Sequence, residues 1–272
     1  MTASMVKLDW PCVILAGGLG TRLKEETEFK PKPMVKIGHQ PVLWHIMRIY
    51  AHFGFENFII CLGYRGDAIR EYFHHYNLHA QDIMVDLGKS QIVPLDDGDD
   101  NVHWKVVLAE TGLHTMTGGR VAEVLKYIAS DNFLLTYGDG VGNVNIPRVI
   151  EAHQETGATV TMTAVRPVSR FGKMSCEGNM VTEFREKQPL DTGWINGGFF
   201  VVNKKIASYL DGPATILEQG PLSRLAGERK LAVYHHEGFW QCMDTQREVE
   251  LLNRLWSAGN APWTIWEEPD RK

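Results

Sequence analysis

The chain has 272 residues, of which 44% are hydrophobic and 22% charged, and its formal net charge at pH 7 is −5. This composition is typical of a soluble globular protein that buries its own core without disulfides or a structural metal. The negative net charge argues against nucleic acid or an anionic membrane as the main partner. No apolar run approaches the roughly 18 residues needed to span a membrane, and residues 1–10 lack a secretory signal pattern. We therefore expect a cytoplasmic protein.

The cysteines carry little information about function. The four of them, Cys12, Cys61, Cys176 and Cys242, stand far apart, so the chain has neither a Cys-x-x-Cys redox motif nor a zinc knuckle. Their spacing favours buried free thiols in a reducing compartment.

Strand and helix patterns alternate through most of the chain. Short runs of β-branched and apolar residues predict buried strands, and apolar residues recurring every three to four positions predict helices. The predicted strands are 12–16, 57–62, 106–109, 133–137 and 159–165, and the predicted helices are 42–55, 66–76, 120–129 and 146–155. This alternation predicts an α/β fold with a doubly wound, mostly parallel, Rossmann-like sheet.

The second half of the chain adds a different pattern. Residues 171–203 contain short strands separated by turn residues, which predicts a small antiparallel addition rather than a separate domain. A closing helix is predicted at 249–256. Without internal repeats or a linker, residues 1–272 are predicted to form a single domain.

Residues 82–103 fit this scheme poorly because they hold the acidic stretch Asp96-Asp97-Gly98-Asp99-Asp100 between two short apolar runs. The stretch lacks the residue order and the closing Glu of a calcium loop. It is expected to form a surface hairpin or loop, and a subunit contact is the alternative.

A glycine-rich loop, Gly17 to Gly20, follows the first predicted strand and continues into Thr21-Arg22. Position 23 is Leu, so the loop is not a dinucleotide fingerprint, and it also lacks the Gly-Lys-Ser/Thr of a Walker A loop. Glycines after a buried strand let backbone N–H groups approach a polyphosphate, and Arg22 adds a cation with a planar fork.

The longer string from Leu15 to Gly38 contains Gly-x-Gly-Thr-Arg, then Thr27, then Lys32-Pro33. In this order and spacing it resembles the signature of the sugar-phosphate nucleotidyltransferases. The resemblance runs from about 13 to 266 and is greatest to the cytidylyltransferase members, on Leu43–Met47, Met116–Arg120, Thr136–Gly140, Asn196–Phe200, Gly238–Gln241 and Met243–Thr245. Two segments depart from the family: Glu186-Lys187-Gln188-Pro189 replaces its Glu-Lys-Pro, and 82–103 has no close counterpart.

The resemblance implies transfer of CMP from CTP to a hexose 1-phosphate, with α-D-glucose 1-phosphate expected, and release of pyrophosphate with the help of Mg²⁺. The product would be a nucleotide sugar of the kind used to build polysaccharides. It also implies a nucleotide-binding half at about 11–145 and a sugar-phosphate-binding half at about 146–272. We further expect a homo-oligomer and, from the net charge given above, no nucleic acid or membrane as a partner. A uridylyl- or thymidylyltransferase, or a non-catalytic relative that senses nucleotide sugars, remains the alternative.

The same resemblance implies two metal ligands, Asp139 and Asp244. Asp139 follows the strand 133–137 between two glycines, where a plain Asp-Gly turn is the alternative. Asp244 could instead cap the helix that follows it. Lys32 lies between two prolines that stiffen its backbone, which suits a fixed cation. Arg22, Lys32 and Asp139 are the catalytic residues that the resemblance implies.

The nucleotide would be held by residues of the glycine loop and of two later segments. The implied set is Leu15, Ala16, Gly17, Gly18, Leu19, Gly20, Thr21, Arg22, Lys32, Thr115, Gly119, Arg120 and Gly138. Arg120 is further expected to select cytosine, because a guanidinium has only donors and cytosine offers adjacent acceptors at O2 and N3. A phosphate contact or a solvent-exposed position for Arg120 is the alternative.

The sugar phosphate would be held by residues of the second half. Glu186 and Lys187 would contact the phosphate and the sugar hydroxyls, and Asn196 and Gly197 would add polar contacts. Trp240 could stack on a sugar face or pack in the core.

Overall fold

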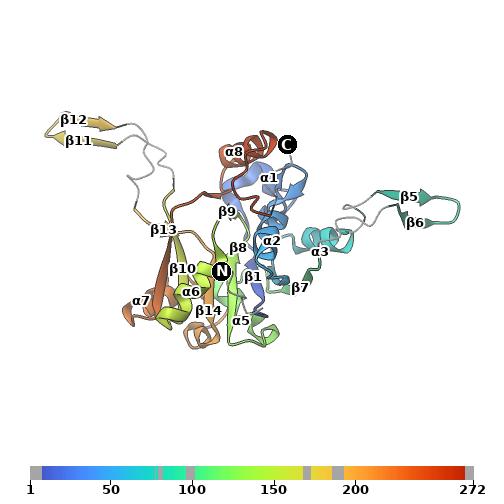
Figure 1. Ribbon diagram of the computed structural model, residues 1–272, viewed down its shortest axis with the longest axis horizontal. Helices are drawn as coiled ribbons and strands as arrows, with labels where there is room; N and C mark the ends of the chain where they lie inside the picture. The colour runs from blue at the N-terminus through green and yellow to red at the C-terminus, as the bar shows by residue number, and fades with distance from the viewer. Residues whose placement is uncertain are drawn as a thin grey trace, which may run out of the picture.

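The computed structural model describes residues 8–76, 78, 82–95, 102–167, 173–185 and 193–266. A mixed eight-stranded sheet forms the centre, with helices on both faces (Figure 1). Its strands are β1 Cys12–Leu15, β4 Asn57–Leu62, β7 Lys105–Glu110, β8 Asn132–Tyr137, β10 Val160–Val165, β13 Ile195–Asn196, β14 Phe200–Asn203 and β15 Leu231–His236. The helices are α1 Lys24–Thr27, α2 Val42–His52, α3 Gly66–His74, α5 Thr117–Val124, α6 Ile146–Thr156, α7 Pro221–Gly227 and α8 Gln246–Ser257.

The order of the strands confirms the predicted fold class. β7, β4, β1 and β8 lie side by side and are parallel, whereas β14 joins β8 and β10 in antiparallel fashion and β15 runs parallel to β10. From β1 the chain moves outward to β4 and β7, and then crosses to the other side of β1 to form β8. The carboxyl ends of β1 and β8 therefore flank the topological switch point, where open α/β sheets bind their ligands.

The sheet is buried on both faces, as a doubly wound sheet requires. Along β1, Cys12 and Ile14 belong to one hydrophobic cluster and Val13 and Leu15 to a second one. Side chains of α2, α3, α6 and α8 belong to the first cluster, and those of α5 and α7 to the second. Continuous apolar runs in the strands follow from this double coverage.

Most predicted elements occur within a few residues of their predicted bounds, and β4 has the predicted bounds of 57–62. The start of α5 is different, since this helix begins at Thr117 rather than at Arg120. Gly118 and Gly119 disfavour a helix by propensity. In the fold, however, they allow the backbone of α5 to approach Pro213 and Thr215 so closely that an added Cβ would clash. α7 and the 3-10 helix Lys204–Tyr209 had no prediction.

Four small two-stranded sheets complete the structure. They are β2 Lys36–Ile37 with β3 Gln40–Pro41, β5 Ile83–Asp86 with β6 Gln91–Pro94, β9 Gly140–Gly142 with β16 Trp240–Cys242, and β11 Lys173–Glu177 with β12 Met180–Arg185. The pairs β5–β6 and β11–β12 project from the body as hairpins (Figure 1). β11–β12 matches the predicted antiparallel addition, and β5–β6 confirms a hairpin for the described part of 82–103.

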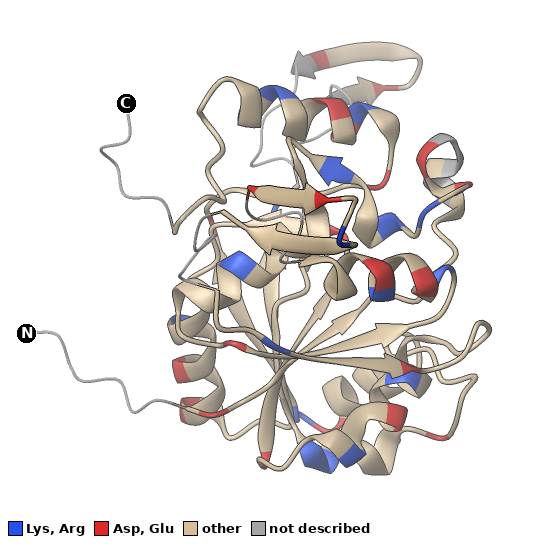
Figure 2. Ribbon diagram, turned by 90° about the vertical axis from the view of Figure 1, so that its right-hand side faces the viewer, with Lys and Arg blue, Asp and Glu red and all other residues tan. Residues whose placement is uncertain are grey.

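The expectation of buried free thiols is met by two of the four cysteines, and the charged residues are distributed as the composition suggests. Basic and acidic positions are interspersed over the coloured elements in Figure 2, and no described helix is long and apolar enough to cross a membrane. All four cysteines are free thiols. Cys12 and Cys61 are buried as predicted, but Cys176 is exposed and Cys242 half-buried, because they lie on the projecting hairpin and beside the cavity described next.

Candidate active site

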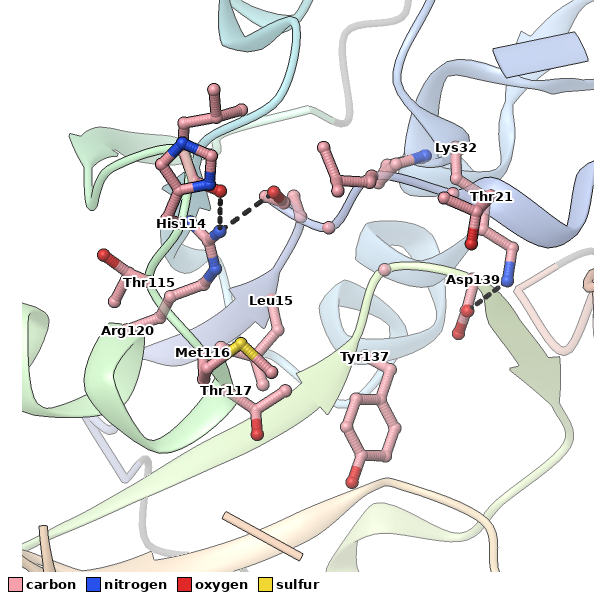
Figure 3. Close-up of a pocket in the computed structure, with 18 of the residues that line it drawn as sticks. Leu15, Thr21, Lys32, His114, Thr115, Met116, Thr117, Arg120, Tyr137 and Asp139 are labelled. Carbon is pink, nitrogen blue, oxygen red and sulfur yellow. Dashed lines mark hydrogen bonds and ion pairs between the residues drawn. The ribbon is translucent and has the colours of Figure 1, made fainter. Parts of the chain in front are cut away.

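A cavity of about 550 Å³ opens at the carboxyl ends of β1 and β8 (Figure 3). It is therefore located at the switch point of the sheet. Its walls are made by the glycine loop, by the segment leading into α5, and by the turns that follow β8 and β16. The lining residues are Leu15, Ala16, Gly17, Gly18, Leu19, Gly20, Thr21, Lys32, Pro33, Leu113, His114, Thr115, Met116, Thr117, Arg120, Tyr137, Gly138, Asp139 and Asp244.

The glycine loop has a fixed backbone conformation. Gly20 has a positive φ of 63°, and its carbonyl accepts a hydrogen bond of 3.0 Å from the Thr27 hydroxyl. The backbone N–H groups of Gly18 and Leu19 donate to no acceptor among the described residues. Two such free donors beside a cavity are suited to binding phosphate oxygens. The side chain of Arg22, predicted to act here, lies outside the described part of the structure.

At one end of the cavity, Lys32 contacts two carboxylates. Its Nζ donates to Asp139 Oδ2 at 2.6 Å and to Asp244 Oδ1 at 2.5 Å. Burial alone would lower the pKa of Lys32, but the charges and hydrogen bonds of the two carboxylates raise it above its ordinary value. The lysine is therefore protonated, and its positive charge lies between the two carboxylates.

Two small strands bring these carboxylates together. Asp139 lies in the turn between β8 and β9, and Asp244 follows β16 directly. β9 and β16 pair in antiparallel register, with Gly140 opposite Cys242, and Met243 N donates to Asp139 O at 2.8 Å. The N-cap of α8 is Thr245, so the alternative in which the Asp244 side chain caps this helix is wrong.

The donor set at this end fits a magnesium ion. Among the described residues, no group of three or more His, Cys, Asp and Glu side chains could hold a metal. Mg²⁺ does not need such a cage, because it is commonly bound by one or two carboxylates together with phosphate oxygens of a substrate. Asp139 and Asp244, both within 2.6 Å of the same Nζ atom, supply two hard oxygen donors in one place.

Arg120 lies at the opposite end of the cavity (Figure 3). Its side chain is buried, and burial lowers the pKa of the guanidinium. Nη1 donates to Leu62 O at 2.8 Å and to Thr111 Oγ1 at 2.6 Å, while Nη2 donates to Gly17 O at 2.9 Å and more weakly to Leu113 O at 3.5 Å. The alternative of a solvent-exposed Arg120 is therefore wrong.

These contacts give Arg120 a role that its sequence position does not reveal. The guanidinium links Gly17, the first glycine of the loop, to the carboxyl end of β4 and to the segment before α5. A Cβ added to Gly17 would lie 2.1 Å from Nη1, so only glycine allows this approach. The selection of cytosine by Arg120 stays a prediction, and it requires the terminal nitrogens to exchange protein acceptors for the base.

Among the other predicted nucleotide contacts, Thr115 and Gly138 line the cavity. A side chain at Gly138 would come within 2.9 Å of Leu15 O, which explains the glycine there. Gly119 does not line the cavity. Its backbone N–H donates to Thr215 O at 3.2 Å, and its place in the structure is in the packing of α5.

Three of the predicted sugar-side residues, Asn196, Gly197 and Trp240, lie beside the cavity rather than in its lining. Asn196 Nδ2 donates to the Tyr137 hydroxyl at 3.0 Å. Trp240 Nε1 donates to Gly197 O at 2.8 Å, and the half-buried indole packs against the first hydrophobic cluster. Of the two alternatives for Trp240, this contact favours packing in the core, at least for part of the indole ring. Glu186 and Lys187 lie outside the described residues.

Several lining residues were missed by reasoning from the sequence. Tyr137 and Thr117 are the clearest cases, because each makes a hydrogen bond of 2.7 Å or less to Glu218, which was missed as well. A signal was available for Tyr137, which ends the strand leading to Asp139. For Glu218, just before α7, the sequence offers no comparable signal.

The comparisons with known proteins agree with this geometry. Residues 12–240 match the family model described as nucleotidyl transferase. The chain is 46% identical over 262 residues to glucose-1-phosphate cytidylyltransferase of Salmonella typhi, covering 94% of this chain and 99% of that one. It is 43% identical over 256 residues to a probable glucose-1-phosphate cytidylyltransferase of Bacillus subtilis strain 168, covering 93% and 99%. The chain therefore belongs to the nucleotidyl transferase family.

Solved structures share the fold at lower identity. A UDP-glucose pyrophosphorylase complexed with UDP-glucose superposes with a TM-score of 0.65 at 13% identity, covering 93% of this chain and 100% of that one. HddC from Yersinia pseudotuberculosis, complexed with GMP-PN, gives 0.65 at 23% identity, covering 91% and 99%. These likenesses confirm the Rossmann-like sheet.

The contacts of Arg120 predict that Arg120→Ala destabilises the protein. The change removes the buried hydrogen bonds to Leu62 O, Thr111 Oγ1 and Gly17 O and leaves a cavity in place of the guanidinium, at a cost of about 2 kcal/mol or more in the free energy of unfolding. Urea unfolding would measure it, with Arg148→Ala as the control, since Arg148 is an exposed arginine that pairs with Glu151 at 3.6 Å. Equal stability of the two variants would contradict the role assigned to Arg120.

Proposed function

We propose that the protein transfers CMP from CTP to α-D-glucose 1-phosphate and releases pyrophosphate. The observation that carries the proposal is the meeting of Lys32, Asp139 and Asp244 at one end of a cavity lined in part by the glycine loop, whose Gly18 and Leu19 N–H groups donate to no described residue. The choice of CTP and glucose 1-phosphate is supported by the names of the most similar relatives quoted above, which the chain matches over nearly its full length.

In this reaction an oxygen of the sugar 1-phosphate attacks the α-phosphorus of CTP. The new P–O bond forms as the bond from that phosphorus to the bridging oxygen breaks, and the electron pair leaves with pyrophosphate. Both reactants are anions, so the protein's task is to position them and to neutralise charge. No proton has to be transferred, and the chain needs no nucleophilic side chain.

The residues of the cavity can divide this work between them. The N–H groups of Gly18 and Leu19, together with Lys32, would hold the triphosphate, with Arg22 as the further cation. Asp139 and Asp244 would hold Mg²⁺, which when bound neutralises phosphate charge and orients the reacting oxygens. The base would lie toward Arg120, at the other end of the cavity from Asp139.

The rest of the predicted set is proposed on the same basis. Residues of about 11–145 would bind the nucleotide, through Leu15 to Arg22 and through Thr115, Arg120 and Gly138. Residues of about 146–272 would bind the sugar phosphate, through Glu186, Lys187, Asn196, Gly197 and Trp240. Gly119 would act only by letting α5 pack closely.

The substrate assignment predicts which pairs of reactants turn over. Pyrophosphate release would be measured for CTP, UTP, dTTP and ATP, each with the 1-phosphates of glucose, galactose and mannose. We expect the highest kcat/KM for CTP with glucose 1-phosphate. Faster turnover with UTP or dTTP would replace the proposal by a uridylyl- or thymidylyltransferase. Absence of release from every pair would favour a nucleotide-sugar sensor.

The metal assignment predicts that Asp139→Asn removes most of the activity. An amide keeps the shape of the carboxylate but loses its charge, so kcat should fall by roughly two powers of ten or more at saturating Mg²⁺. EDTA should abolish turnover by the unaltered protein. Asp211→Asn is the matched control, because the Asp211 side chain is 78% exposed and its partner in the described part of the chain is Arg224, away from the cavity lining. Near-normal activity of a folded Asp139→Asn variant would remove Asp139 from the site.

We also propose that the protein is a cytoplasmic homo-oligomer that assembles through the β5–β6 hairpin. A two-stranded hairpin that stands alone is marginally stable in water. This one nevertheless exposes apolar side chains along its length, namely Met84, Val85, Leu87, Ile92, Val93 and Leu95. Further copies of the same chain are the commonest partners of a soluble enzyme and would cover these side chains.

The buried thiols Cys12 and Cys61 suit a reducing compartment, and burial raises the pKa of Cys61 to about 12.

Assembly through this hairpin predicts that Val85→Thr/Ile92→Thr lowers the mass in solution. The two residues are cross-strand partners, and threonine keeps their strand propensity while adding hydroxyl groups. Sedimentation velocity should show a shift toward the monomer. Tyr127→Thr, which alters an exposed aromatic residue next to α5, is the control. An unchanged mass would place the contact elsewhere, and a monomeric unaltered protein would refute assembly.

A further inference from the structure

A chain of hydrogen bonds crosses the wall of the cavity between α5 and β13. The Thr117 hydroxyl donates to Glu218 Oε2 at 2.7 Å, and the Tyr137 hydroxyl donates to Glu218 Oε1 at 2.6 Å. Tyr137 in turn accepts from Asn196 Nδ2 at 3.0 Å. Thr117 and Tyr137 line the cavity, so the chain joins its nucleotide side to the strand that carries Asn196.

The direction of every hydrogen bond in this chain is determined. Leu217 N can only donate, and it donates to Thr117 Oγ1 at 2.9 Å, so the Thr117 hydroxyl hydrogen is left for Glu218. At the other end, Gly198 N donates to Asn196 Oδ1 at 2.9 Å. The amide nitrogen of Asn196 must therefore face Tyr137, whose own hydrogen goes to Glu218. A single arrangement satisfies all the groups.

The charge of Glu218 sustains this arrangement. As a carboxylate it only accepts, so both hydroxyl groups must donate to it. Burial raises the pKa of Tyr137, and the neighbouring charge of Glu218 raises it further. The phenol therefore keeps its proton at every working pH and remains a donor to Glu218 and an acceptor for Asn196.

The arrangement leaves one donor of Asn196 unused. Its amide nitrogen has two N–H groups, one of which is given to Tyr137, and the other donates to no acceptor among the described residues. Because the amide cannot turn over without breaking two hydrogen bonds, this second N–H has a fixed direction beside the cavity. Such a group is suited to an acceptor oxygen of a bound ligand.

We propose that Tyr137 and Glu218 are positioning residues for the sugar phosphate. They hold the amide of Asn196 with its nitrogen toward Tyr137, so that its second N–H can donate to a hydroxyl or phosphate oxygen of the hexose 1-phosphate. The inference rests on the proposed function and on the place of Asn196 in the sugar-phosphate half. It extends that function because Tyr137 and Glu218 would affect the binding of the hexose 1-phosphate and not that of CTP.

The test is the kinetics of Tyr137→Phe, measured by pyrophosphate release with each substrate varied in turn. Phenylalanine keeps the ring but removes the hydroxyl that orients Asn196. Loss of one oriented hydrogen bond should raise the KM for glucose 1-phosphate roughly tenfold. The KM for CTP should change less than about twofold. A rise confined to the KM for CTP, or no change in either, would overturn the inference.

Tyr209→Phe is the matched control. The Tyr209 hydroxyl donates to Glu228 Oε2 at 2.6 Å, so the same kind of pair occurs away from the cavity. Its removal should leave both KM values unchanged, whatever its effect on the melting temperature. If Tyr209→Phe raises the KM for glucose 1-phosphate as Tyr137→Phe does, the effect is one of general stability and the positioning role fails.

Glu218→Gln provides a second, nearly isosteric test. Glutamine offers one acceptor where two hydroxyl groups donate, so either Thr117 or Tyr137 must reverse its hydrogen. If Tyr137 and Glu218 act as one unit, the double variant Tyr137→Phe/Glu218→Gln should raise the KM for glucose 1-phosphate no more than Tyr137→Phe alone. A KM increase in the double variant equal to the product of the two single increases would overturn the inference. The proposed function fails separately, when the unaltered protein releases no pyrophosphate from CTP and glucose 1-phosphate.

Discussion

The ammonium group of Lys32 connects three parts of the chain that are distant in sequence. It lies between the carboxylates of Asp139 and Asp244, and these come together only because β9 pairs with β16. Two carboxylates in contact would repel each other without a cation between them. The lysine therefore makes the meeting of the carboxylates possible in the ligand-free protein, and with it the end of the cavity that the proposed chemistry needs.

Arg120 has a comparable part at the other end of the cavity. It is a buried cation that contacts no carboxylate of the described residues, and its donors are used by the carbonyls of Gly17, Leu62 and Leu113 and by the Thr111 hydroxyl. A buried charge is tolerated only when its donors are used in this way. One cation thus orders the carboxylates and the other orders the backbone of the glycine loop, so the two ends of the cavity are shaped before any ligand arrives.

The sequence predicted what depends on local patterns. β-Branched and apolar residues predict buried strands such as 57–62, and the position of the glycines after the first such strand predicts the loop. The pairing of β9 with β16 could not be predicted, since three-residue strands have no periodicity and their partners are distant in sequence. The contacts of Arg120 were missed for a similar reason. A guanidinium beside a glycine turn suggests a ligand, and only the fold shows that backbone carbonyls surround it.

Glu218 illustrates this limit most clearly. Its neighbours in sequence carry no recognised motif, yet in space it accepts hydrogen bonds from both Thr117 and Tyr137, which belong to different elements. The directions of these bonds follow from elementary rules, because backbone N–H groups only donate and carboxylates only accept. Once the fold has brought the groups together, those rules leave Asn196 a single orientation. The selectivity of the sugar side would then depend on a carboxylate that does not line the cavity.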